Sequence, residues 1–162
     1  MKSSRRKYLL AIPVLSLLLI ATYATNAFGT PSSTNAVSTL LNQSAFDQRV
    51  QINTDSDKLM LKALNGMDVA NVQTVAQPGW TSGWHRHAGP AIVAIKSGSL
   101  TFYLPDCSSF TVTAGHGYVE TPGVPILARN ESGGVTEWYT THLIPHGALT
   151  RLDEPDSLCG LN

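Results

Sequence analysis

The chain has 162 residues and a formal net charge of zero at pH 7, with eleven Lys and Arg against eleven Asp and Glu. Four of the basic residues lie within the first seven positions, so the remainder carries seven basic and eleven acidic side chains, a net charge near −4. A mildly acidic domain without a basic run excludes nucleic acid and anionic lipid as partners, because it offers no electrostatic footprint for phosphate groups. The length is that of one domain with a core of its own.

The first 29 residues have the three parts of a secretory signal peptide. The head carries four basic side chains, Lys2, Arg5, Arg6 and Lys7. An apolar run over residues 9–20 follows, and the small residues after it predict cleavage after Ala27 or after Gly29. An uncleaved anchor is the alternative, although the run is shorter than the ~20 residues that span a bilayer. We therefore expect a secreted protein, periplasmic or extracellular, with no membrane contact beyond this leader.

The basic head also resembles the twin-arginine export signal, which would carry a folded protein across the membrane. The strongly apolar run is more typical of the general secretory route, so both routes stay open. Either route leads out of the reducing cytosol. Cys107 and Cys159 are therefore expected to form a disulfide bond. Closing a loop of 52 residues would contribute about 4 kcal/mol in the chain-entropy model, and two free thiols are the alternative.

Residues 30–45 are rich in Ser, Thr, Asn and Ala and predict a flexible tether. Short edge strands are expected at residues 46–52 and 58–62. Further strands are expected around His85 and His87 and at residues 68–76, 91–95, 100–104, 110–114, 118–121, 126–130 and 136–143, separated by turns rich in Gly and Pro. Apart from residues 37–46, no segment shows helical periodicity over ten or more positions. The sequence therefore predicts an all-β barrel or sandwich over residues 46–148, followed by a disulfide-tied tail over residues 149–162.

His85 and His87 are two residues apart within one of these strands. Successive side chains of a strand point to opposite faces, so both imidazoles should share one face. Neutral imidazole binds divalent transition metals such as Zn, Cu, Fe and Ni, and a carboxylate beside it also admits Mn. A Gly-Pro turn, the apolar run 91–95 and a second turn at Gly98 follow.

This arrangement resembles the first motif of the cupin superfamily, a Gly, an HxH pair, a Glu and a closing Gly. His85, His87 and Gly98 match it, whereas the position of the Glu falls among Pro90, Ala91 and Ile92. The resemblance implies a double-stranded β-helix, or jelly roll, with a metal in its barrel.

A second cupin motif runs Gly, Pro, Gly, His and Asn. The chain carries Gly117, Pro122, Gly123 and Asn130 in this order. The position of the His, four residues before Asn130, is occupied by Ile126. The resemblance covers roughly residues 67–143 and keeps only part of the family's metal site.

A stable site requires a third protein ligand, and three residues are candidates. Glu120 lies just before Pro122 on the strand that leads into the second motif, and it is the best of the three. With His85 and His87 it would form a set of two histidines and one carboxylate. His142 ends the last strand, and His116 lies in a glycine turn and should be solvated. The alternatives are an ordinary rim carboxylate at Glu120 and a hydrogen-bonded, metal-free histidine pair.

Three functions stay open at this point. One is a metal-dependent enzyme acting outside the cytoplasm, with oxygenase or isomerase chemistry as the resemblance implies. Another is a non-catalytic module that binds a divalent metal and a small molecule in the barrel. The last is a structural or interaction protein with a degenerate, metal-free site, whose edge strands pair two copies into a homodimer. The sequence leaves open whether the chain is an enzyme, and it names no substrate.

Overall fold

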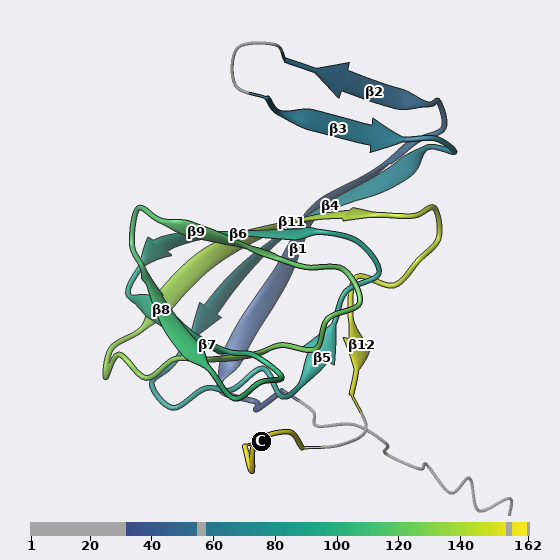
Figure 1. The fold of residues 1–162 in the computed structure, drawn as a ribbon. Coiled ribbons are helices and arrows are strands. Elements are labelled where there is room, and N and C mark those ends of the chain that lie inside the picture. The colour runs from purple at the N-terminus through teal and green to yellow at the C-terminus, as the bar shows by residue number, and fades with distance from the viewer. Residues whose placement is uncertain (1–31, 55–57, 155–156, 162) are drawn as a thin grey trace, which may run out of the picture.

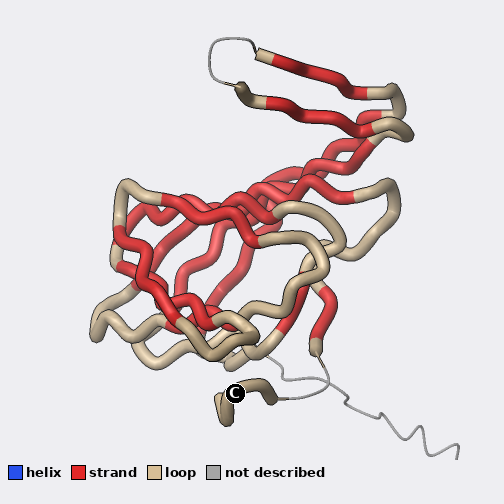
Figure 2. Tube along the Cα trace, in the orientation of Figure 1, coloured by secondary structure: helices blue, strands red, loops and turns tan. Residues whose placement is uncertain are grey.

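The computed structural model describes residues 32–54, 58–154 and 157–161 (Figure 1). The leader at residues 1–29 and both expected cleavage positions lie outside these ranges. Within the described ranges every regular element is a β-strand, as Figure 2 shows by colour. No helix there has the length and apolarity needed to cross a membrane. The all-β fold class expected from the turn pattern is confirmed.

Twelve strands follow one another along the chain. They are β1 (Ala36–Phe46), β2 (Val50–Asn53), β3 (Met60–Ala63), β4 (Met67–Ala76), β5 (His85–Arg86), β6 (Ala91–Ser97), β7 (Ser99–Tyr103), β8 (Ser109–Thr113), β9 (Gly117–Glu120), β10 (Leu127–Arg129), β11 (Thr136–Ile144) and β12 (Leu152–Asp153).

Two sheets enclose the core. The larger has the strand order β1-β4-β11-β6-β9, and the smaller has the order β10-β7-β8. All of their neighbouring strands run antiparallel. The non-consecutive order shows that the chain crosses repeatedly between the sheets, as a jelly roll requires. Hydrogen bonding among the described strands leaves the sheets open, so they face each other instead of closing into one continuous barrel (Figure 1).

The core follows the two-residue period of the strands. Along β6 the side chains of Ala91, Val93 and Ile95 are buried, whereas Ile92 between them is exposed. Phe102 on β7 is fully buried and contacts the rings of Phe110 and Tyr118, with centroids 5.5 and 5.2 Å away. The buried cluster that joins the sheets consists of Ala76, Trp80, Val93, Ile95, Leu100, Phe102, Val112, Ile126, Ala128 and Trp138.

Gly98, the closing glycine of the first motif, makes the tight turn between β6 and β7. Its φ of +76° lies in the left-handed region that favours glycine. A Cβ at this position would lie only 2.4 Å from Thr136 Oγ1 and 2.9 Å from the carbonyl oxygen of Val135. Both the backbone angle and the close approach of β11 therefore require glycine here.

The expected tether at residues 30–45 is wrong for most of its length. Residues 36–46 form β1, which pairs with β4 from Ala36↔Ala76 to Phe46↔Met67. Ten of its eleven residues are exposed, so its sequence carries no buried face that alternation could reveal. Backbone pairing with β4 makes it a strand in place of the helix that residues 37–46 also allowed.

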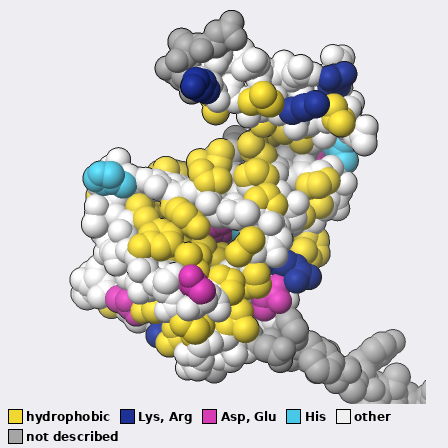
Figure 3. Space-filling view, in the orientation of Figure 1, with side chains coloured by type: hydrophobic (Ala, Val, Ile, Leu, Met, Phe, Trp, Pro, Cys, Tyr) yellow, Lys and Arg dark blue, Asp and Glu magenta, His cyan; other side chains and the backbone are white. Residues whose placement is uncertain are grey.

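The two short edge strands are real but displaced from residues 46–52 and 58–62. They form the hairpin β2–β3, which pairs Val50 with Ala63 and makes a separate two-stranded sheet. Figure 1 shows this hairpin standing away from the two large sheets, beyond the ends of β1 and β4. Large apolar side chains are exposed on the hairpin and on β1, and Figure 3 shows apolar atoms on the hairpin.

The C-terminal tail is held by more than its cysteine. β12 pairs with β5, with Asp153 opposite His85 and Leu152 opposite Arg86. The sulfur atoms of Cys107 and Cys159 are 2.07 Å apart and form a disulfide bond across 52 residues of sequence. The tail therefore lies against the strand that carries the histidine motif.

Candidate metal centre

Three buried side chains from two strand regions meet inside the fold. His85 begins β5, His87 follows that strand by one residue, and Glu120 ends β9. One potential ligand atom from each of the three lies within 4.8 Å of the others. Each residue is only 5 % exposed. Of the three candidates for a third ligand, Glu120 is the one that the structure brings to the histidine pair.

Hydrogen bonds orient both imidazoles. Nδ1 of His85 lies 2.9 Å from the carbonyl oxygen of Gly83. Nδ1 of His87 bonds the carbonyl oxygen of Thr150. A carbonyl oxygen can only accept, so the proton of each neutral ring lies on Nδ1 and the lone pair on Nε2. Such partners commonly fix the tautomer of metal-binding histidines.

Glu120 faces His87 at close range. Its Oε2 lies 2.5 Å from Nε2 of His87, yet this buried oxygen has no hydrogen-bond partner among the described residues. With the proton of His87 on Nδ1, two lone pairs point at each other. A cation bound to both atoms removes this repulsion, and a proton shared as an ion pair is the metal-free alternative. Two imidazole nitrogens and one carboxylate form a donor set that zinc, iron and manganese all accept, so these residues fit a divalent metal.

Burial keeps His85 in the form that binds metal. Removal from water lowers the pKa of His85 well below its usual value, and the positive charge of Arg151 and the adjacent His87 lower it further. A neutral imidazole is the form that coordinates a metal ion. His85 is therefore ready to bind metal without first losing a proton at neutral pH.

Ala91, one of the three residues where the first cupin motif would place its Glu, and Ile126, at the position of the second motif's His, both lie beside this centre. Ala91 on β6 is paired with Glu120 on β9, and Ala91 is fully buried. Ile126 forms an antiparallel bridge with His85 and is 2 % exposed. Antiparallel partners share a face of the sheet, so Ile126 lies on the same face as His85. Apolar side chains thus occupy both motif positions that lack a ligand.

The other two histidine candidates do not join the cluster. The ring centroid of His142 lies 5.0 Å from that of His87, and its buried Nδ1 has no hydrogen-bond partner among the described residues. Burial lowers the pKa of His142 to about 4, and His87 adds to this shift. His116 is exposed in its turn, as expected. His142 is therefore a neutral polar group beside the centre and not one of its three clustered ligands.

A cavity of about 260 Å³ adjoins the three clustered side chains. Its apolar lining includes Trp80, Val93, Leu100, Phe102 and Trp138. Among the described lining residues, Arg151 carries the only permanent positive charge and Glu120 the only carboxylate. Its volume is below the roughly 300–1,000 Å³ of pockets that bind drug-sized ligands, so the cavity suits a smaller molecule.

Two residues of this site lie outside the motifs from which it was predicted. The carbonyl of Thr150 orients His87, and Arg151 lines the cavity, where its Nη2 donates to the carbonyl oxygen of Ser82 over 2.7 Å. Both come from the tail that the sequence predicted to be a disulfide-tied appendage. Any residue type offers a backbone carbonyl, so the identity of residue 150, 63 positions after His87, could not indicate this hydrogen bond. The one available signal was Arg151 itself, a basic residue in an otherwise acidic tail.

Comparisons with known proteins support the fold. No family model matches the chain, and no curated protein matches it. A double-stranded β-helix protein from Klebsiella pneumoniae superposes with a TM-score of 0.53 at 16% identity, covering 78% of this chain and 91% of that one. The polyketide cyclase RemF from Streptomyces resistomycificus gives a TM-score of 0.51 at 14% identity, covering 78% of each chain.

A cupin superfamily protein from Desulfitobacterium hafniense gives a TM-score of 0.50 at 12% identity, covering 69% of this chain and 80% of that one. The chain therefore has the double-stranded β-helix fold of these proteins, which is the fold that the resemblance of its motifs implied. At such identities the likeness establishes the fold, and function has to be argued from the site.

Proposed function

We propose that the chain binds one divalent transition metal through Nε2 of His85, Nε2 of His87 and the carboxylate of Glu120. The observation that carries this proposal is the buried Oε2 of Glu120, 2.5 Å from Nε2 of His87 without a hydrogen-bond partner among the described residues. A bound metal of this kind supplies Lewis acidity, and its identity is one of Fe, Mn, Zn, Ni or Cu. His85 and His87 hold it, and Glu120 neutralises part of its charge.

We further propose that the adjoining cavity takes a small anionic molecule, such as a carboxylate with an apolar body. A divalent cation held by two neutral imidazoles and one carboxylate leaves a net positive centre. The guanidinium of Arg151, which also pairs with Asp153 at 2.6 Å, adds hydrogen-bond donors beside it. The bonds of Arg151 to Ser82 and Asp153 use two of its five N–H groups. The tryptophan and phenylalanine walls favour the apolar body of such a ligand.

This proposal treats binding as the function and leaves the reaction, if there is one, unassigned. The second candidate is a structural cupin with a metal-free site. Buried Ala91 and Ile126 at two motif positions favour it, because apolar side chains there remove ligands. The open cavity beside the histidines argues against it, since a purely structural barrel would be packed to the density of a core.

We propose that the protein works outside the cytoplasm. The leader pattern of residues 1–29 and the pairing of Cys107 with Cys159 support this location, because disulfide bonds persist in oxidising compartments. N-terminal sequencing of the exported protein from its native host tests it. A mature end at Phe28 or Thr30 agrees with export, whereas an intact Met1 in the cytosol contradicts it.

Titration calorimetry tests the metal proposal. Tag-free protein, first freed of metal with a chelator, is titrated with Zn²⁺ and Mn²⁺. We expect one site per chain in the wild type and its loss in the His85→Ala/His87→Ala double variant. Circular dichroism checks that this variant still folds. A wild-type protein that takes up no metal, or a double variant that binds as the wild type does, would overturn the proposal.

A further inference from the structure

The C-terminal strap, residues 149–154 and 157–161, touches the metal ligands directly. The carbonyl oxygen of Thr150 accepts the N–H of His87 Nδ1. β12 of the strap pairs with β5, placing Asp153 opposite His85. These contacts reach both histidine ligands from a segment more than sixty residues further along the chain.

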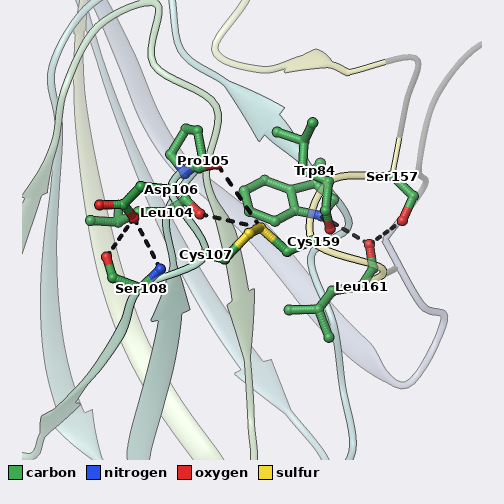
Figure 4. The surroundings of a disulfide bond; sticks show 10 residues. Trp84, Leu104, Pro105, Asp106, Cys107, Ser108, Ser157, Cys159 and Leu161 are labelled. Atoms are coloured by element: carbon green, nitrogen blue, oxygen red, sulfur yellow. Dashed lines mark hydrogen bonds between the residues drawn. A yellow bond between two sulfur atoms is a disulfide. The ribbon is translucent and has the colours of Figure 1, made fainter.

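The far end of the strap is fastened beneath the same strand. The indole N–H of Trp84, the residue before His85, donates to the carbonyl oxygens of Leu158 and Leu161 over 3.1 and 2.9 Å. Cys159 of the strap is bonded to Cys107 in the turn between β7 and β8. Figure 4 shows the indole of Trp84 beside this disulfide, with its N–H directed at the strap.

A few further contacts hold the strap in place. They are the two-residue strand β12, the bond from Arg151 to the carbonyl oxygen of Ser82, the bond from the amide of Glu154 to the carbonyl oxygen of Trp84, and one ion pair that joins Glu154 to Arg86 at 2.8 Å. Chain ends with so few contacts open locally at low free-energy cost. The covalent bond of Cys159 restricts the strap in such open states, because its far end stays attached near Trp84.

We propose that the strap is a positioning element for the metal ligand His87. The carbonyl of Thr150 holds the proton of His87 on Nδ1, so that Nε2 presents its lone pair beside Glu120. The Cys107–Cys159 bond keeps this carbonyl in place. Metal affinity therefore depends on two cysteines that touch neither the metal ligands nor the cavity. That Nε2 of His87 binds a metal rests on the proposed function. The proton on Nδ1 of His87, in contrast, can be observed in protein without metal.

The test compares the wild type with the Cys107→Ser/Cys159→Ser double variant, which keeps side chains of nearly the same size. In metal-free protein, nitrogen-15 NMR of the imidazoles reports which ring nitrogen of His87 carries the proton. We expect a proton on Nδ1 in the wild type, whether or not Nε2 shares a second proton with Glu120, and a fraction of rings without a proton on Nδ1 in the variant. Zn²⁺ affinity should fall by about 10–100-fold, the loss that follows removal of an outer-shell partner of a metal ligand.

Two further variants make the result decisive. Adding Arg86→Gln to the serine pair removes the ion pair to Glu154 and should release the strap further, increasing both effects. Thr136→Val is the matched control for lost stability, because it deletes a buried hydroxyl that bonds Ser99 at the opposite end of β11 from His142. This control should unfold more easily while the His87 tautomer and the Zn²⁺ affinity stay at wild-type values.

Hydrogen exchange of the amides of residues 149–154 shows whether the strap is released. Two results would overturn the proposal. One is that both cysteine variants keep the wild-type proton position on His87 and the wild-type protection of the strap amides from exchange. The other is a strap whose amides exchange freely while the proton position on His87 is unchanged. Failure of the wild type to bind Zn²⁺ would count against the metal function alone, since the tautomer of His87 is measured without metal.

Discussion

Ala91 on β6 lies directly opposite Glu120 on β9, and both side chains are buried beside the histidine pair. Ala91 is one of the three positions at which the first cupin motif would place its Glu. Cross-strand partners have Cβ atoms about 4.5–5.5 Å apart, so a carboxylate on either strand reaches the same region. The carboxylate of this chain thus lies on β9, one strand away from the motif position on β6.

This relationship predicts that the carboxylate can be moved back. Glu120→Ala should weaken Zn²⁺ binding by more than the ~10–100-fold that loss of an outer-shell partner costs, because it removes a ligand and its charge. The Ala91→Glu/Glu120→Ala double variant should recover most of this affinity in calorimetric titrations.

The Ala91→Gln/Glu120→Ala variant is the matched control, since glutamine has the shape of glutamate without its charge. If the glutamine variant binds as well as the glutamate variant, size and not ligation explains the recovery. If Glu120→Ala alone binds like the wild type, Glu120 is not a ligand.

Ile126 offers a gain of function, because it lies beside His85 where the second cupin motif has a histidine. Ile126→His should raise Zn²⁺ affinity by adding a third imidazole. The same change should destabilise the metal-free protein by about 1–3 kcal/mol, since a buried polar ring replaces a packed apolar side chain. Urea unfolding with and without Zn²⁺ measures both effects. A variant that loses stability without gaining affinity would show that residue 126 does not face the centre.

His142 predicts a pH dependence of stability in metal-free protein. Its pKa is about 4 when folded against a reference value of 6.5, so the unfolded chain binds more protons between these values. The free energy of unfolding should therefore fall as the pH drops below about 6.5, by on the order of 3 kcal/mol near pH 4. Burial of His85 acts in the same direction.

His142→Asn removes this titrating group and should flatten the loss between pH 7 and pH 4.5. Urea unfolding in the presence of a chelator, at several pH values, measures it for both proteins. An equal slope in the wild type and the variant would show that His142 titrates alike in the folded and unfolded states.

Arg151 predicts the charge of the small ligand. In Zn²⁺-loaded protein, small carboxylates such as butyrate and benzoate should bind more tightly than butyramide and benzamide. Arg151→Gln should weaken carboxylate binding by roughly 10–100-fold, the range for a hydrogen bond to a charged group, and leave Zn²⁺ affinity within a few-fold of wild type. Calorimetry with each ligand provides the measurement.

Arg49→Gln is the control for Arg151→Gln. Arg49 is exposed just before β2 and does not line the cavity, so its loss should leave carboxylate binding unchanged. Equal affinity for carboxylates and amides in the wild type would contradict an anionic ligand.

Much of the fold was predictable because its signals are local. Gly and Pro turns separate the strands, and alternation along segments such as residues 91–95 identifies their buried faces. β1 was missed because nearly all of its side chains are exposed, so only pairing with β4 makes it a strand. The sequence also did not show that the two sheets stay open. That depends on which distant strands form hydrogen bonds with one another, and residue types do not reveal such pairings.

The candidate site was predictable to a similar degree. His85 and His87 were identified by a spacing within one strand, and Glu120 by its place before the second motif. Thr150 and Arg151 were missed because the tail brings them to the centre only through its pairing with β5. His142 was placed on the correct strand, but only the three-dimensional arrangement shows that it lies beside His87 without joining the three clustered ligands.

Anomalous X-ray diffraction from Zn²⁺-soaked crystals of the tag-free protein tests the central claim most directly. We expect one strong peak per chain about 2.0–2.2 Å from Nε2 of His85, Nε2 of His87 and a carboxylate oxygen of Glu120. No peak at this position, or occupancy of a surface histidine such as His116 in its place, would contradict the account.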